Sequence, residues 1–243
     1  SLQLSVRTQG GHSSMPPEKT AIGMLAAAID KLESHQLPVA IRGATAAMFD
    51  YLGPEMSFTR RVALANRWLF DPLIEREFGA SPEGNAMLRT TTAPTIFHAG
   101  VKENVLPSSA AAVVNFRILP GDDVASVVEH VRRTIDEPRI EIEPLTFRSE
   151  PSPMSDLSSA SFETLQRTVQ QIFPEAIFAP YLVVGGTDSR YYTDVTANVY
   201  RFNPMYLNRE DFKSVHGTDE RVSLDACADM VRFYVQLIHE TAG

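Results

Sequence analysis

The sequence is poor in cysteine, has fewer basic than acidic residues, and lacks long apolar runs. Its single cysteine, Cys227, excludes an internal disulfide and a cysteine-rich metal site. The 22 Lys and Arg residues against 30 Asp and Glu residues give a net charge of -8, so we expect no nucleic-acid partner, because phosphate binding needs a basic face. The longest apolar runs are far shorter than a membrane span, so the sequence predicts no membrane partner. These absences leave the compartment open between cytoplasmic and exported.

The beginning of the chain has the pattern of a strand followed by a helix. Leu2, Leu4 and Val6 alternate with polar residues, which predicts a strand with one buried face. Because the chain opens within a residue or two of this strand, we expect it to be part of a longer protein. A helix from residue 18 should end before Pro38, and its apolar stripe is Ile22, Leu25, Ile29 and Leu32.

The next hundred residues complete a recognisable order of elements. Residues 42–90 mix aromatic side chains with charges and prolines, which predicts an insertion of short helices with its own small apolar cluster. Strands should follow at 94–97 and 112–118, then a helix capped by Asp123, then a strand around residues 140–142. The order strand, helix, strand, strand, helix, strand is that of a ferredoxin-like split-βαβ sandwich, an antiparallel sheet with helices on one face.

The rest of the sequence predicts an α/β domain. Residues 147–157 are polar and punctuated by proline, which places a crossing between a first domain, 1–146, and a second domain, 147–243. After a helix that begins near Phe162, a buried apolar strand at 181–184 should end in a glycine loop. A strand-like segment follows at 198–202. The last helix should bury one stripe, formed by Leu224, Cys227, Val231, Tyr234 and Ile238.

Two histidines stand in settings suited to chemistry. His12 lies at a strand-to-helix corner, where its imidazole can donate a hydrogen bond to a docked ligand; the alternative is a surface turn whose histidine has no role. His216 lies in a short loop before the last helix and suits a metal ion, or else bonds only to nearby backbone. One histidine cannot complete a zinc site, and the sequence has no HExxH, HxD or CxxC motif.

Other residues are suited to gripping a carboxylate or a carbonyl. The Gly185-Gly186-Thr187 loop offers backbone N–H groups and a hydroxyl to an anion. Asn104 and Arg117 have suitable side chains, although by residue type Arg117 fits a solvated strand face better. Asp188 and Arg190, in the same loop as the glycines, can equally form an ion pair that fastens it.

Six motifs, in this order, resemble the M20 family of dinuclear zinc peptidases, in its carboxypeptidase S and N-acyl-amino-acid hydrolase branch. Each motif alone is weak, but six in sequence, covering the chain nearly end to end, make the resemblance specific. They are Gly10-Gly11-His12-Ser13-Ser14-Met15-Pro16-Pro17, Asn104-Val105-Leu106-Pro107, Asn115-Phe116-Arg117-Ile118-Leu119-Pro120-Gly121, Gly185-Gly186-Thr187-Asp188-Ser189-Arg190, Tyr200-Arg201-Phe202-Asn203-Pro204 and His216-Gly217-Thr218-Asp219-Glu220-Arg221.

The resemblance implies a role for each candidate residue. Residues 1–146 would form a lid and dimerisation domain, followed by the C-terminal part of a zinc-binding α/β catalytic domain. His12 would be the lid histidine that bonds the oxyanion, often in the partner subunit's active site, and Asn104 and Arg117 would contact the substrate from the lid. The residues implied in the catalytic domain are Gly185, Gly186 and Thr187, which would line the substrate pocket, and His216, the last zinc ligand.

The resemblance also implies an activity. The expected reaction is the zinc-dependent hydrolysis of an amide bond next to a free carboxylate, in a small peptide or an N-acyl amino acid, by a homodimer paired through the lid. The intact enzyme would hold two zinc ions, with the other ligands and a glutamate base in a segment that precedes the lid. We therefore expect this chain alone to retain no zinc and to be inactive. The alternative is a non-catalytic ferredoxin-like module that dimerises or senses a ligand, which leaves the settings of His12 and His216 unexplained.

Overall fold

The computed structural model describes residues 1–146, 148–208, 211 and 214–242. The chain divides into two compact units, of which the first comprises Ser1–Ala46 and Val62–Ser152 and the second Ala47–Arg61 and Pro153–Gly243. Phe147, in the predicted crossing, lies outside the described residues. Among the described residues, no helix is both long enough and apolar enough to cross a bilayer.

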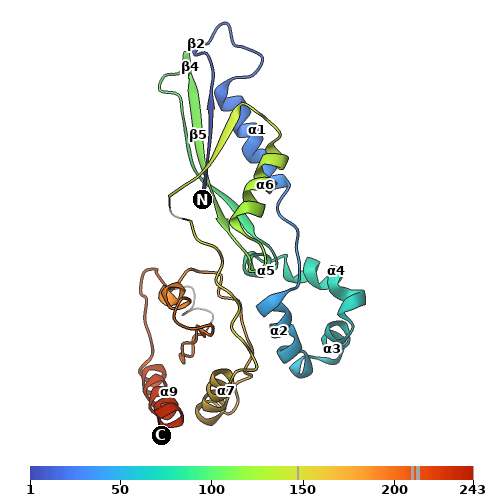
Figure 1. The fold of residues 1–243 in the computed structure, drawn as a ribbon, viewed down its shortest axis with the longest axis vertical. Helices are drawn as coiled ribbons and strands as arrows, with labels where there is room; N and C mark the ends of the chain where they lie inside the picture. Colours follow the sequence, from blue (N-terminus) through green and yellow to red (C-terminus); the bar gives the residue numbers. More distant parts are fainter. Residues whose placement is uncertain (147, 209–210, 212–213, 243) are drawn as a thin grey trace. The chain divides into compact units, whose positions relative to one another are not determined.

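The first unit is built on a four-stranded antiparallel sheet (Figure 1). Its strands lie in the order β3-β5-β1-β6, and β5 and β1 are the two central ones. This is the strand order of a ferredoxin-like fold, so the predicted fold class is confirmed. The strands are β1 (Leu2–Arg7), β3 (Thr91–Ala99), β5 (Ser109–Arg117) and β6 (Ile140–Pro144).

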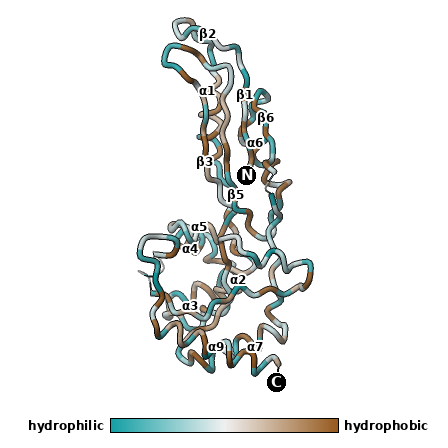
Figure 2. The backbone as a smooth tube through the Cα atoms, turned by 90° about the vertical axis from the view of Figure 1, so that its left-hand side faces the viewer, coloured by the Kyte–Doolittle hydropathy of each residue, from teal (hydrophilic) through white to brown (hydrophobic). Residues whose placement is uncertain are grey.

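Two helices, α1 (Ala21–Ser34) and α6 (Val124–Ile135), lie side by side and pack on the sheet (Figure 1). The alternating residues of β1 and β5 point into this core, and the change of hydropathy along the chain can be followed in Figure 2. Asp123 caps α6 as predicted, because its carboxylate accepts from the Ser126 N–H at 2.7 Å. The fully buried members of this core include Leu4, Leu25, Val114 and Val131.

Helix α1 begins later than predicted and buries a different face. Thr20 accepts from the Gly23 N–H and so begins the helix three residues later than the sequence suggested. Ile22 of the predicted stripe is 41% exposed. Helical spacing fits a second stripe equally well, and small alanines on it let the helix approach the sheet closely. The residues actually buried are Ala21, Met24, Leu25, Ala28 and Leu32.

The predicted insertion of short helices is confirmed, but its predicted apolar cluster is wrong. Neither α3 nor α4 has a buried residue, and Trp68 of α4 is 82% exposed. The buried apolar side chains of the insertion lie instead in α2 and α5. The elements are α2 (Gly43–Leu52), the 3-10 turn η1 (Gly53–Glu55), α3 (Phe58–Ala65), α4 (Arg67–Phe78) and α5 (Pro82–Leu88).

A polar latch holds both ends of the insertion to the loop that follows β5. Asp122 accepts from the Arg42 guanidinium at 2.6 Å and from the Thr90 hydroxyl at 2.6 Å. Thr90 in turn accepts from the Leu119 N–H at 2.9 Å. Gly121 has a φ of +103°, and a Cβ there would lie 3.2 Å from the guanidinium of Arg42. Residues 42, 90 and 119–122 are therefore tied at one point, next to the end of β5 that carries Arg117.

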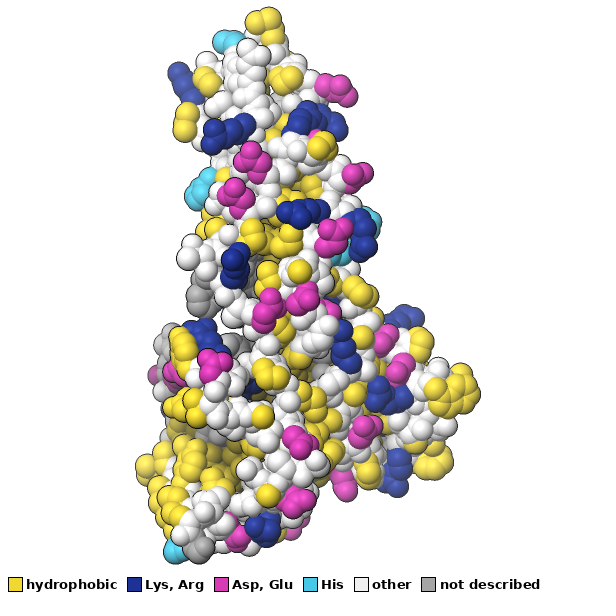
Figure 3. Space-filling view, viewed as in Figure 1, with side chains coloured by type: hydrophobic (Ala, Val, Ile, Leu, Met, Phe, Trp, Pro, Cys, Tyr) yellow, Lys and Arg dark blue, Asp and Glu magenta, His cyan; other side chains and the backbone are white. Residues whose placement is uncertain are grey.

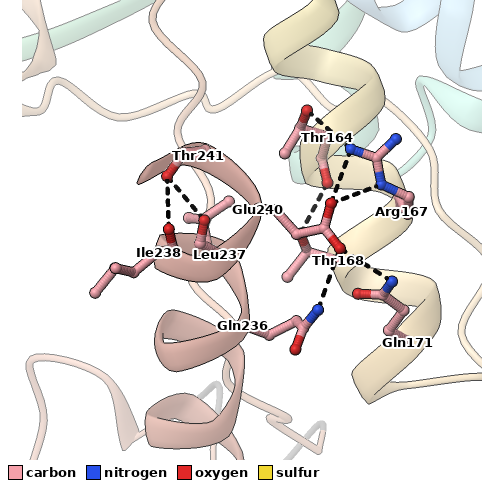
Figure 4. A network of polar contacts seen from close by, with 9 residues as sticks. All are labelled: Thr164, Arg167, Thr168, Gln171, Gln236, Leu237, Ile238, Glu240 and Thr241. Atoms are coloured by element: carbon pink, nitrogen blue, oxygen red, sulfur yellow. Dashed lines mark hydrogen bonds and ion pairs between the residues drawn. The ribbon is translucent and has the colours of Figure 1, made fainter. Parts of the chain in front are cut away.

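The second unit pairs helix α7 (Ala160–Ile172) with helix α9 (Leu224–Ala242). Figure 4 shows the polar contacts that join them: Glu240 of α9 accepts from Arg167 at 3.0 Å and from Gln171 at 3.3 Å, both on α7. Within α9, Glu240 also accepts from Gln236 at 3.2 Å. The stripe predicted to be buried on α9 is wrong, since Leu224 is 88% and Ile238 62% exposed. The buried residues of α9 are Ala226 and Phe233.

The two strands predicted for the second unit are also wrong. Residues 181–184 and 198–202 have no strand assignment, and Tyr181 is 57% exposed. A strand needs a neighbour for its ladder of hydrogen bonds, and the described residues 153–208 and 214–242 provide none. Between the two helices, the 3-10 turn η2 (Asp188–Tyr192) follows the glycine loop.

We predict that Glu240 makes the stability of the second unit depend on pH in the acid range. Its pKa is lowered, first because Gln171 donates to the carboxylate and further because the Arg167 charge lies close. As pH falls, the unfolded chain therefore takes up the proton before the folded one. The stabilisation is complete above the ordinary pKa of 4.5 and is lost as pH falls through the lowered value.

Urea titrations followed by circular dichroism, at a series of pH values from about 3 to 6, measure this effect. Glu240→Gln should lower stability at the upper end of the range and flatten its fall towards acid pH. Glu163→Gln, at an exposed position of α7, is the matched control and should leave the profile unchanged. A Glu240→Gln profile that superimposes on that of the unchanged protein would contradict the assignment.

Candidate active site

A short two-stranded ribbon brings His12 and Asn104 together at one end of the first unit. Strand β2 (Gly11–His12) pairs with β4 (Val105–Leu106), and His12 lies opposite Val105. The Ser13 N–H donates to the backbone carbonyl of Asn104 at 3.3 Å. Both side chains are exposed, so two residues that are far apart in the sequence are presented to solvent at the same tip.

The contacts of His12 define which ring nitrogen carries the proton. Ser14 donates its backbone N–H to Nδ1 at 3.2 Å, and its hydroxyl lies 2.8 Å from the same atom. A backbone N–H can only donate, so Nδ1 is the acceptor and the neutral imidazole carries its proton on Nε2. The ring thus presents an N–H donor on the side away from Ser14. Ser14 therefore orients the histidine. The sequence signal for this role was the position of Ser14, two residues after His12.

The two glycines before His12 have different roles. A Cβ on Gly10 would lie 2.9 Å from the carbonyl oxygen of Leu106 and 3.3 Å from the Ser108 N–H, so this glycine allows the two chains to approach. A Cβ on Gly11 would meet no atom within 4 Å. Of the two glycines, only Gly10 is therefore needed for the close approach of the two chains in the ribbon.

Arg117 lies at the other end of the sheet. It is the last residue of β5, is exposed, and stands opposite Thr91 of β3. The tip with His12 adjoins the first residue of β5, because the Thr8 N–H donates to the Ser108 carbonyl. At about 3.4 Å per residue, this nine-residue strand separates the two ends by about 27 Å. Within one copy of the first unit, His12 and Arg117 cannot contact the same small ligand.

The glycine loop of the second unit is open to solvent. Gly185, Gly186 and Thr187 are exposed, and a Cβ on either glycine would meet nothing within 4 Å. That space lets a ligand approach the backbone N–H groups. The Thr187 and Ser189 hydroxyls lie 2.5 Å apart, and Arg201 donates to both from Nε, at 3.3 Å and 2.6 Å. Arg190 instead contacts Tyr191, to whose hydroxyl it donates at 2.7 Å.

His216 has a strained backbone. Its φ of 60° lies in the left-handed region, which is uncommon for residues other than glycine, and its side chain is exposed. The turn is closed by the Gly217 N–H, which donates to the Ser214 carbonyl at 2.7 Å. Such strain concentrates at functional sites, because the surrounding structure must hold it in place.

The described residues do not assemble a metal centre. Within the part of the chain that the structure describes, no group of three or more His, Cys, Asp or Glu side chains is arranged to hold a metal ion. A zinc site needs three or four protein ligands, so His216 does not complete one. The structure also shows basic and acidic side chains interspersed on the face drawn in Figure 3.

Comparison with known proteins places this geometry in a family. Residues 1–143 match the model of the M20 peptidase dimerisation domain. The chain belongs to the M20 peptidases. A Dictyostelium discoideum protein named "Probable carboxypeptidase S-like 2" is 42% identical over 240 residues, covering 99% of this chain and 46% of that protein. The human N-fatty-acyl-amino acid synthase/hydrolase PM20D1 is 43% identical, over 98% of this chain and 48% of its own length. The chain thus spans about half the length of these relatives.

Solved structures of M20 peptidases share the fold. An M20 metallo-carboxypeptidase from Sulfolobus solfataricus matches 98% of this chain and 60% of its own, with a TM-score of 0.55 at 13% identity. A Staphylococcus aureus tripeptidase matches 98% of this chain and 50% of its own, with a TM-score of 0.59 at 14% identity. At these identities the likeness concerns the fold.

We predict that Gly10 and Gly11 respond differently to alanine. Gly10→Ala should force the β2–β4 ribbon apart and destabilise the first unit by about 1–3 kcal/mol, because the new methyl group meets backbone. Gly11→Ala is the matched control and should change stability by less than about 0.5 kcal/mol. Amide hydrogen exchange of residues 10–15, with urea unfolding, measures both. Equal effects of the two substitutions would show that the ribbon does not depend on this approach.

Proposed function

We propose that the protein hydrolyses an amide bond next to a free carboxylate, in a small peptide or an N-acyl amino acid. The observation that carries the proposal is the imidazole of His12, whose Nε2–H donor is presented beside Asn104 on an M20 dimerisation domain. The names of the relatives, a carboxypeptidase S-like protein and N-fatty-acyl-amino acid hydrolases, support this substrate class. In this proposal, residues 1–146 are the lid and residues 147–243 the C-terminal part of the catalytic domain.

Each candidate residue has a role that its chemistry supports. His12 donates its Nε2–H to the oxyanion of the tetrahedral intermediate, and deleting one such donor typically costs about 10²–10³ in rate. Asn104, on the same tip, contacts the substrate. Arg117 binds the substrate carboxylate through its planar pair of donors. The glycine loop offers further N–H and hydroxyl donors to the substrate.

The metal requirement is proposed on the family resemblance. His216 serves as one zinc ligand, and its strained, exposed backbone position supports that role. The other ligands and a glutamate base belong, by the same resemblance, to a segment that precedes the lid. Two bound zinc ions would supply a water of lowered pKa and a polarised carbonyl.

A second copy of the chain is part of the proposed site. Because the length of β5, about 27 Å, separates the tip with His12 from Arg117, one lid cannot offer both to one small substrate. A homodimer solves this, since the tip of one lid can reach the site of its partner. The edge strand β3 suits the pairing: it spans nine residues and exposes Ile96 at 46% and Phe97 at 42%.

We predict that His12 and His216 fail in different ways in the whole enzyme. His216→Ala should lower the bound metal measured by elemental analysis, and excess zinc should partly restore activity. His12→Ala should retain its metal and lose about 10²–10³ in kcat with little change in KM. The activity to follow is the hydrolysis of an N-acyl amino acid, with its methyl ester as the matched substrate that lacks the carboxylate.

Mixing the two variants tests whether His12 acts on the partner's site. Heterodimers of His12→Ala with His216→Ala contain one site with both residues, so activity should return on mixing. If the His12→Ala enzyme had a normal kcat, His12 would have no catalytic role and would only be part of a surface turn. Equal rates of hydrolysis for the N-acyl amino acid and its methyl ester would contradict the proposed recognition of the carboxylate.

We also predict a homodimer paired through β3. Light scattering at micromolar concentrations should give twice the mass of the chain, and Ile96→Lys should give a monomer, because a charge on the edge strand opposes pairing. Trp68→Lys places the same charge at an exposed hydrophobic residue of α4, 82% accessible, and is the matched control. A monomer at all concentrations, or equal effects of both lysines, would exclude this interface.

A further inference from the structure

The segment Tyr200-Arg201-Phe202, a motif without a role so far, is anchored by its two aromatic rings. The Tyr200 ring lies 5.5 Å from that of Phe162 on α7, and the Phe202 ring lies 5.1 Å from that of Phe233 on α9. The Tyr200 hydroxyl also lies 2.6 Å from the Ser159 hydroxyl, which caps α7, and donates to the Asp156 carbonyl. The segment is thus tied to both helices of the second unit.

The backbone before this segment is held by side chains in place of a strand ladder. The Val199 N–H donates to the Ser155 hydroxyl at 2.8 Å, and that hydroxyl donates to the Val199 carbonyl at 3.1 Å. The Asp156 N–H donates to the Asn198 side chain at 2.7 Å. Residues 198–202 are therefore held in place, although they form no sheet.

Arg201 contacts different partners from its two neighbours. Its Nε donates to the Ser189 hydroxyl at 2.6 Å and to the Thr187 hydroxyl at 3.3 Å. Thr187 stands at the N-cap of η2, where a threonine hydroxyl would ordinarily accept from the backbone, yet it makes no such bond here. Its hydroxyl is engaged by Arg201 and Ser189.

We propose that Arg201 is the positioning residue of the glycine loop: it clamps Thr187 and Ser189 and so holds the N–H groups of Gly185 and Gly186 in place for a substrate carboxylate. The role of the loop in binding rests on the proposed function, but the clamp does not. Hydrogen bonds from a guanidinium to a hydroxyl are stronger than neutral ones, so one side chain can order an exposed loop. A Cβ on either glycine would meet nothing within 4 Å, so the space beside the loop is open.

Hydrogen exchange measures the clamp in this chain without any activity. Arg201→Ala should speed the exchange of the Arg190 amide, which donates to the Thr187 carbonyl at 3.3 Å, by at least about tenfold, while the amides of α7 and α9 keep their rates. Arg201→Lys keeps the charge but loses the Nε–H, so it should not restore the slow exchange. Arg232→Ala, which removes an exposed arginine of α9 that pairs with Asp229, is the matched control. Unchanged exchange in Arg201→Ala would overturn the clamp.

A second pair of variants covers the case in which Arg201→Ala unfolds the unit. Thr187→Val with Ser189→Ala removes both acceptors and leaves Arg201 in place, so it should speed exchange of the same Arg190 amide; slow exchange in this double variant would also overturn the clamp. In the whole enzyme, Arg201→Ala should raise KM for an N-acyl amino acid about tenfold and leave kcat nearly unchanged. If exchange were faster but KM were unchanged, the clamp would be supported. The loop would then not be part of the proposed binding site.

Discussion

The antiparallel pairing of β5 with β1 and β3 is the constraint on which the first unit depends. It sets the register that points one face of β1 and β5 into the core and places Arg117 opposite Thr91. It also fixes the distance between the two ends of the sheet, because an extended strand cannot shorten. The separation of His12 from Arg117 follows from this geometry, and the homodimer proposed above rests on that separation.

The second unit achieves order by other means. Its described residues hold two packed helices, and the segments between them are tied by side chains: hydroxyls of Ser155 and Ser159, the ring of Phe202 and the guanidinium of Arg201. Such contacts place individual residues without the repeated backbone bonds of a sheet. Many of its apolar side chains, among them Leu224 and Tyr181, are exposed. Substitutions here should therefore act locally, on one loop at a time.

The sequence could predict the elements whose signals are local. The alternation of β1 and β5 and the cap at Asp123 lie within a few residues, and each appears in the structure as expected. The buried faces of α1 and α9 could not be read in the same way, because the packing partner selects one of two stripes that fit the helical repeat. Residues 181–184 are apolar enough for a strand, but pairing depends on a neighbour that the local pattern does not reveal.

The residues of the candidate site could be proposed from the sequence, but their arrangement could not. His12 and Asn104 could each be chosen from their motifs, yet their proximity depends on a ribbon of two residues per strand, too short to leave a periodic signal. The separation of Arg117 requires the sheet order. The role of Arg201 needed the hydroxyl contacts, although the aromatic residues on either side of it indicated an anchored segment.

The two edge strands of the sheet, β3 and β6, differ in how readily they can pair with a further strand. In β3, Pro94 lacks an N–H and the register shifts between Pro94 and Ile96, so the longest uninterrupted run of donors begins after this irregularity. In β6, Glu141 and Glu143 place like charges along the edge, and the strand ends at Pro144. Pairing through β3 would leave only the acidic β6 edges outward, where copies repel each other. A sheet paired in this way would close after two copies and would be protected from adding further strands into a fibre.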